Sequence, residues 1–126
     1  MKHNDIGKLG EDIAANFLKK NGYSIVERNI HLSYNEIDIV AKNKEFIVFV
    51  EVKTRSVGKD LYSPYGTPAT AVTKQKQKRT ITAALQYLNK NKYIKLQPRV
   101  DVIEVYLDKE TAEVLKINHI DNAFYA

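Results

Sequence analysis

The sequence predicts an α/β protein with a mixed β-sheet flanked by helices, because its elements follow a distinctive order. Apolar residues recur at helical spacing in residues 5–21 and 73–89. Three strand-like segments lie between these helices, and two more follow the second helix. The segment from Phe46 to Val50 is apolar on both faces, which is typical of a central strand that is covered on both sides. This order favours a sheet with helices packed on its faces.

The length and composition are those of one globular domain spanning residues 1–126. The chain is 44% hydrophobic and 28% charged, and a domain of this size normally has a single core. The absence of cysteine excludes a disulfide scaffold, a thiolate zinc site and a cysteine nucleophile. We find no apolar run long enough to span a bilayer and no apolar leader segment. We therefore expect a cytoplasmic protein with no membrane partner.

The first helix is expected over residues 5–21, and its core side is an apolar stripe formed by Ile6, Leu9, Ile13 and Phe17. The Asn-Gly dipeptide after it supplies the stop, since glycine favours the left-handed conformation that follows many helices. Glu11 lies at the edge of the stripe, where small Gly7 and Ala14 would let the helix approach the sheet. Glu11 could therefore reach over the sheet, although a solvated boundary glutamate is the alternative. Asp12 is expected to point to solvent.

The middle of the chain is expected to form an antiparallel meander of three strands, over residues 23–29, 36–41 and 45–53. A long loop should follow from Thr54 to Pro68, because the apolar pattern disappears there among glycines and prolines. The second helix, residues 73–89, is expected to bury a face formed by Ile81, Ala84, Leu85 and Leu88. The last two strands are expected over residues 100–107 and 112–118.

Two acidic residues fall on one predicted face of this meander. Strand alternation predicts that Asp38 and Glu51 share a face, and that Lys53 lies on it two residues beyond Glu51. A hairpin that turns at residues 43–44 places Phe49 opposite Asp38, so that the two acids become diagonal neighbours. A divalent cation would offset the cost of burying both carboxylates. Oxygen ligands without cysteine or paired histidines favour Mg²⁺ or Mn²⁺.

Each of these residues also has a simpler interpretation. Asp38 and Glu51 could be a chance pair of acids near strand ends. Lys53 could be an ion pair at the end of its strand. Beside metal-bound carboxylates, however, the Lys53 ammonium could orient an attacking water or stabilise the charge that develops in a transition state.

Basic residues are concentrated in one half of the chain. The net charge is +5, yet residues 53–99 carry eleven basic residues and a single acid, Asp60. Such a stretch favours a polyanionic partner, although a solvated lysine-rich surface would have the same composition. Lys74 and Lys78 lie four residues apart and therefore share one side of the second helix.

Five short blocks, which together cover nearly the whole chain, carry a family resemblance. They are GKLGE at residues 7–11, EIDIV at 36–40, FVEVKTR at 49–55, RVDV at 99–102 and NAF at 122–124. In this order they resemble the PD-(D/E)xK nuclease superfamily and, more closely, the YraN-like family of small bacterial proteins. That family is related in fold to archaeal-type Holliday junction resolvases, so the resemblance implies a restriction-endonuclease-like fold. We interpret Arg99 and Asp101, in the fourth block, as a structural ion pair.

The resemblance also implies a role for each candidate residue. Asp38 and Glu51 would bind Mg²⁺ or Mn²⁺, with the main-chain carbonyl of Val52 as a third ligand. Lys53 would support catalysis directly. Glu11 would have an accessory catalytic role.

The sequence therefore predicts a metal-dependent nuclease, a single endonuclease-like domain that hydrolyses phosphodiesters in structured or branched DNA. The nucleic acid would contact Arg55, which follows the catalytic strand, and Lys74 and Lys78 of the second helix. Two alternatives stay open, a non-catalytic nucleic-acid-binding module of the same fold and a basic protein-interaction domain. Symmetric cleavage of a junction would require a homodimer, although the sequence identifies no dimer face.

Overall fold

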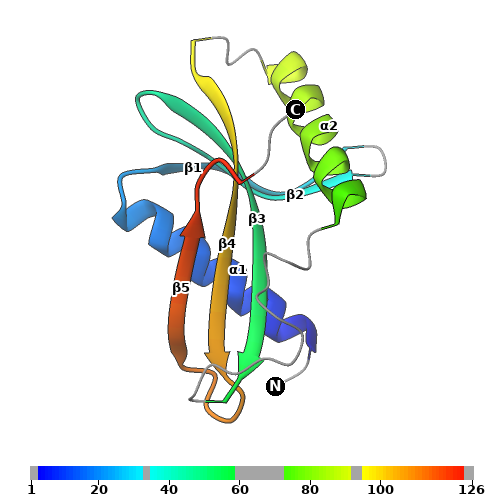
Figure 1. Ribbon diagram of the computed structural model, residues 1–126. Coiled ribbons are helices and arrows are strands. Elements are labelled where there is room, and N and C mark those ends of the chain that lie inside the picture. Colours follow the sequence, from blue (N-terminus) through cyan, green and yellow to red (C-terminus); the bar gives the residue numbers. More distant parts are fainter. Residues whose placement is uncertain (1–2, 33–34, 59–72, 92–94, 124–126) are drawn as a thin grey trace.

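The protein, seen here in a computed structural model that describes residues 3–32, 35–58, 73–91 and 95–123, contains a five-stranded sheet between two helices (Figure 1). The predicted α/β class, with a mixed sheet flanked by helices, is confirmed, and the arrangement is that of a restriction-endonuclease-like fold. In the part of the chain that is described, neither helix is long and apolar enough to cross a membrane.

The elements follow the predicted order along the chain. They are α1 (His3–Lys20), β1 (Ser24–Leu32), β2 (Asn35–Lys42), β3 (Phe46–Val57), α2 (Lys74–Asn91), β4 (Gln97–Asp108) and β5 (Val114–Ile120). The strands lie side by side in chain order, and β1, β2 and β3 form the predicted antiparallel meander. β3 pairs with β4 in parallel, whereas β4 pairs with β5 antiparallel, which makes the sheet mixed.

The helix α1 ends where the sequence predicts. Gly22 has a φ of 90°, in the left-handed region. The amide of Tyr23 donates to the carbonyl of Leu18 at 3.0 Å, and the amide of Gly22 donates to the carbonyl of Lys19 at 3.2 Å. These two bonds form a Schellman motif, which satisfies carbonyls at the helix end and turns the chain into β1.

One close contact sets how near α1 lies to the sheet. A Cβ atom at Gly10 would lie only 1.9 Å from Oγ1 of Thr54 in β3, so that only glycine fits between the helix and this strand. Gly7, one turn earlier, has no atom within 4 Å of its own Cβ position. The helix therefore meets β3 at Gly10, next to Glu11, and leaves space beside Gly7.

The strand β3 is longer than predicted. Residues 54–57, which we expected to begin the long loop, continue the strand to Val57, because they pair in register with β4 as far as Asp108. Pairing along a neighbouring strand satisfies the backbone even where the side-chain pattern is polar. The rest of the predicted loop, from residue 59 to Pro68, lies outside the described residues.

The helix α2 buries only part of the predicted face. Ala84 is buried and Ile81 and Leu88 pack against the core, as predicted, whereas Leu85 is 58% exposed. The other buried residues of the helix are Thr80, Ala83 and Tyr87. The Tyr87 ring packs edge-on against Phe49 of β3 with centroids 5.7 Å apart. Burial of this large ring between small alanines outweighs the burial of Leu85, since aromatic rings bury the most apolar surface.

The turn between β2 and β3 shifts the predicted register. The side-chain oxygen of Asn43 accepts hydrogen bonds from the amides of Glu45 at 2.9 Å and Phe46 at 2.7 Å, and this Asx turn closes the hairpin one residue later than expected. Phe49 therefore pairs with Val40, so the predicted pairing of Phe49 with Asp38 is wrong by two residues.

A buried polar cluster anchors the start of β4. Asp101, which is fully buried, accepts two hydrogen bonds from the Arg99 guanidinium at 2.9 and 2.8 Å, as the predicted structural ion pair requires. It also contacts Nε2 of His119 at 2.6 Å and accepts the Asn122 amide at 2.9 Å. Burial alone would raise the pKa of Asp101, but the contacts with His119, Arg99 and Asn122 outweigh it and hold the pKa below its usual value.

Candidate functional site

The strand β2 changes face at Asp38. Ile39 belongs to a core cluster that includes Leu18 of α1, whereas Ile37, two residues earlier, belongs to a second cluster that includes Tyr87 of α2. In a regular strand these two residues would share a face, so the predicted alternation of β2 is broken at Asp38. The neighbouring strand is distorted at the same level, where Asn29 has a φ of 52°. Asparagine tolerates this left-handed conformation better than most residues do.

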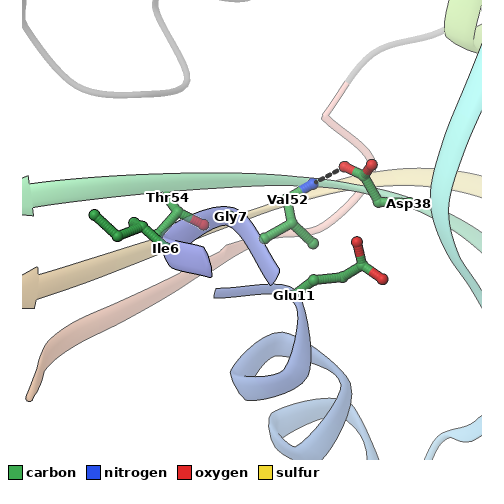
Figure 2. A pocket seen from close by; sticks show the side chains of 6 residues that line it. All are labelled: Ile6, Gly7, Glu11, Asp38, Val52 and Thr54. Atoms are coloured by element: carbon green, nitrogen blue, oxygen red, sulfur yellow. Dashed lines mark hydrogen bonds between the residues drawn. The ribbon is translucent and has the colours of Figure 1, made fainter. Parts of the chain in front are cut away.

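At this point the side chain of Asp38, and not the main chain of β2, accepts a hydrogen bond from β3. The pairing of β2 with β3 ends at Ile39 and Val50, and Oδ2 of Asp38 then accepts a hydrogen bond of 2.8 Å from the amide of Val52 (Figure 2). The N–H and C=O of one strand residue point toward the same neighbouring strand. The carbonyl of Val52 therefore also faces the place where β2 has left β3, beside the Asp38 carboxylate.

The electrostatic environment of Asp38 disfavours its charged form. Burial raises its pKa to about 7, and the negative charge of Glu51 acts in the same direction. The hydrogen bond from Val52 opposes this rise, while Glu11 and Glu36 add smaller increases. Asp38 thus lies within the fields of carboxylates from both α1 and β3, at a position where a cation would be stabilised.

A cavity of about 260 Å³ adjoins Asp38 on the side of α1. Its lining residues are Ile6, Gly7, Glu11, Asp38, Val52 and Thr54. The carboxylate of Glu11 points from α1 toward that of Asp38 (Figure 2). The structure therefore places Glu11 over the sheet beside Asp38, and the solvated-boundary alternative does not describe its position.

Sequence reasoning missed Arg28, which holds Glu11 in this position. Its Nε donates to Oε1 of Glu11 at 3.0 Å, and its Nη2 donates to Oδ1 of Asp12 at 2.6 Å. The expectation that Asp12 only faces solvent is therefore wrong, because it shares this arginine with Glu11. A β-bulge near Val26 sets the register of β1 and β2, and in this register Arg28 pairs with Ile39. The bulge has no clear signal in the sequence, so this pairing could not be predicted.

Glu51 is buried between two lysines. Its Oε1 lies 3.4 Å from Nζ of Lys53 and 3.6 Å from Nζ of Lys76, while its side chain is only 7% exposed. The contact with Lys53 fits the predicted placement of both residues on one face of β3. Lys76, from the first turn of α2, is a second residue that sequence reasoning did not single out.

The predicted nucleic-acid-binding residues lie on the two elements that carry Lys53 and Lys76. Arg55 lies on β3, two residues beyond Lys53, in register with Tyr106 of β4. Lys74 and Lys78 are both exposed in the first turns of α2. Among the described residues, it is Lys76 rather than Lys74 or Lys78 that reaches Glu51.

The donor set fits a hard divalent cation. Within the described ranges no three Asp, Glu or His side chains come together as a ready-made metal cluster. Asp38, Glu51 and the main-chain carbonyl of Val52 nevertheless belong to the level at which β2 stops pairing with β3, and Glu51 is near enough to raise the pKa of Asp38. All three are oxygen donors, as Mg²⁺ and Mn²⁺ prefer, and Mg²⁺ in proteins usually keeps several waters beside one or two carboxylates.

Comparison with known proteins shows that the sequence is similar to one family. The sequence profile of the uncharacterised protein family UPF0102 matches residues 10–105. A UPF0102 protein of Caldanaerobacter subterraneus subsp. tengcongensis is 44% identical, over 94% of this chain and 93% of its own. Those of Caldicellulosiruptor saccharolyticus and Clostridium botulinum (strain Loch Maree) are 42% and 45% identical, over 98% and 95% of this chain and 100% and 94% of theirs. The matched region includes every residue of the site described above except Gly7 and Ile6.

Proposed function

This chain belongs to the uncharacterised protein family UPF0102, in agreement with its YraN-like blocks, and we propose that it is a metal-dependent nuclease acting on structured or branched DNA. The observation that carries the proposal is the position of Asp38. The partly buried carboxylate of Asp38 accepts a main-chain amide of β3 and lies in the field of two other carboxylates, and β3 also carries Lys53 beside Glu51. A perturbed carboxylate with specific charged neighbours beside a cavity is a common property of catalytic sites.

The metal would be held by Asp38, Glu51 and the Val52 carbonyl. A bound Mg²⁺ or Mn²⁺ supplies a Lewis acid that polarises a phosphate and lowers the pKa of a bound water. The Val52 amide fixes one oxygen of Asp38, so that this ligand needs little reorganisation. Glu11, which is held by Arg28, adds negative charge on the side of Asp38 that faces α1. This charge makes the site more favourable for a cation.

Hydrolysis would add one water across a phosphodiester. The water oxygen attacks phosphorus, the bond from phosphorus to one sugar oxygen breaks, and that oxygen takes up a proton. Lys53 lies beside Glu51 on the same face, where its ammonium would orient the attacking water or neutralise charge on the phosphoryl oxygens. Arg55, Lys74 and Lys78 would contact phosphates farther along the DNA.

The choice of substrate rests on the resemblance to junction-resolving enzymes and on the basic half of the chain. Incubation with a four-way junction, a flap and single-stranded DNA, with Mg²⁺, with Mn²⁺ and with chelator, tests it. We expect metal-dependent cleavage of the branched substrates. Binding of these DNAs without cleavage under any condition would favour the non-catalytic binding module, and failure to bind them would favour the protein-interaction domain.

A further inference from the structure

Two lysines from different elements share one oxygen of Glu51. Lys53 comes from the same strand as Glu51. Lys76 comes from α2, which packs on the face of the sheet that carries the Glu51 side chain. The two N···O distances, 3.4 and 3.6 Å, are longer than an ordinary N–H···O hydrogen bond. Both ammonium groups are therefore held as ion pairs and can change partner without loss of a short hydrogen bond.

The first turn of α2 directs Lys76 toward the sheet. The Oγ1 of Thr73 caps the helix by accepting the amide of Lys76 at 3.1 Å, and the hydroxyl of buried Thr80 donates to the Lys76 carbonyl at 3.0 Å. Residues two apart on a helix point in nearly opposite directions. Lys74 and Lys78 therefore face away from Glu51 while Lys76 faces it, and the three lysines cannot serve the same purpose.

Glu51 is paired with two cations before any metal binds. Its one carboxylate lies beside both Lys53 and Lys76, so its charge is already more than compensated. A divalent cation bound to Glu51 would add further positive charge beside the two lysines. The attraction between Glu51 and the two lysines would then weaken, and both lysines would be available to an anionic group. The Lys76 side chain is 38% exposed, so that it can turn toward a ligand outside the protein.

We propose that Lys76 is a second catalytic cation of this site, one that leaves Glu51 and contacts a phosphoryl oxygen of the scissile phosphate when metal and DNA bind. This inference rests on the proposed nuclease function. The N-terminus of α2 carries partial positive charge at the same place, which favours the approach of a phosphate. Lys76 thereby links the basic helix that binds DNA to the carboxylates that bind the metal.

The proposal predicts two effects of Lys76→Ala that a remote DNA-binding lysine would not have. Without DNA, the variant should bind Mn²⁺ roughly three- to tenfold more tightly in calorimetry, because a competing cation has been removed from Glu51. At saturating four-way junction in Mn²⁺, single-turnover cleavage should fall by about 10²- to 10³-fold, the usual scale for one transition-state donor. Lys76→Arg, which keeps the charge, should restore part of both properties.

Lys90→Ala is the matched control, because Lys90 is exposed in the last turn of the same helix. It should match the parent in Mn²⁺ affinity and in cleavage at saturating DNA. If the parent cuts the junction and Lys76→Ala cuts it equally fast, the role of Lys76 is overturned while the nuclease function stands. If the parent cuts no DNA with either metal, both proposals are overturned together. Unchanged Mn²⁺ affinity in Lys76→Ala would also contradict the exchange between Glu51 and phosphate.

Discussion

The Asp38 carboxylate accepts the Val52 amide at 2.8 Å, at the point where β2 stops pairing with β3. A side chain thus replaces a strand partner, which brings an acidic group into the sheet beside a main-chain carbonyl. The arrangement places a partly buried carboxylate near Glu51, and the pKa of Asp38 rises to about 7 as a result of desolvation and of that neighbour. The metal-free protein is therefore less stable when Asp38 is ionised, and this has measurable consequences.

Stability without metal should fall as the pH rises toward 7. The folded protein binds a proton on Asp38 up to about pH 7, whereas the unfolded chain releases it near the ordinary pKa of 3.8. The stabilisation from the proton is complete below pH 3.8 and is lost as the pH rises through 7. In chelator at pH 8, Asp38→Asn should therefore exceed the parent in free energy of unfolding, by at most about 4 kcal/mol.

Urea titrations at pH 8 and pH 4 measure this difference, which should disappear at pH 4. Asp121→Asn changes an exposed aspartate and should track the parent at both pH values. An Asp38→Asn protein that is less stable than the parent at pH 8 would mean that the charge of Asp38 is already compensated within the protein.

The contact between α1 and β3 should be sensitive to a single methyl group. Gly10→Ala would place Cβ 1.9 Å from Oγ1 of Thr54, so that the helix or the strand must shift. We expect a loss of about 1–3 kcal/mol in the free energy of unfolding, as for other overpacked sites. Gly7→Ala is the control on the same helix, where the space is open, and it should stabilise the protein by about 0.5–1 kcal/mol. Equal behaviour of the two variants would show that Gly10 does not set the position of the helix.

DNA affinity should depend steeply on salt because of the basic stretch over residues 53–99. If the protein neutralises about four phosphates of duplex DNA, the slope of log K against log salt should be about −3.6, or roughly 0.9 per phosphate. Fluorescence anisotropy with labelled duplex at several salt concentrations measures this slope. Binding that is independent of salt would argue for a protein partner instead of a nucleic acid.

Lys53 should affect chemistry, whereas Lys74 and Lys78 should affect binding. Lys53→Ala should reduce cleavage at saturating DNA by about 10²- to 10³-fold with little change in affinity, since it removes one transition-state donor. The double variant Lys74→Ala with Lys78→Ala should bind less tightly, with a salt slope smaller by about 1 for each lost phosphate contact. Its turnover at saturating DNA should be nearly that of the parent. The two roles would have to be abandoned if both proteins changed in the same property.

The sequence predicted the element order, the end of α1 and the strands of the sheet, because these depend on local signals such as apolar spacing and the Asn-Gly stop. It also brought Asp38, Glu51 and Lys53 to one region, because the observed pairing of Ile39 with Val50 puts Asp38 level with Glu51. The same reasoning could not predict the break in β2 at Asp38. That break lies level with the left-handed backbone of Asn29 in the neighbouring strand, and a left-handed asparagine within a strand has no unambiguous sequence signal.

The residues that were missed are those that reach the site from elements packed across the sheet. Arg28 contacts Glu11 because β1 and α1 meet on one face, and Lys76 contacts Glu51 because α2 is rotated so that Tyr87, not Leu85, is buried. The rotation of a helix on a sheet is decided by packing, to which helical spacing is only a guide. A pair of alanines beside a tyrosine gives a weaker periodic signal than a run of leucines.

Cleavage of a four-way junction in Mn²⁺ by the parent and by Asp38→Asn, purified in the same way, tests the central claim most directly. The substitution keeps the size of the side chain and an oxygen that can accept the Val52 amide, but it removes the charge that would hold the metal. We predict metal-dependent cleavage by the parent, inhibition by chelator, and a loss of at least about 10²-fold in the variant. Equal cleavage by the two proteins would contradict the assignment of Asp38 as a metal ligand and of this site as the centre of a nuclease.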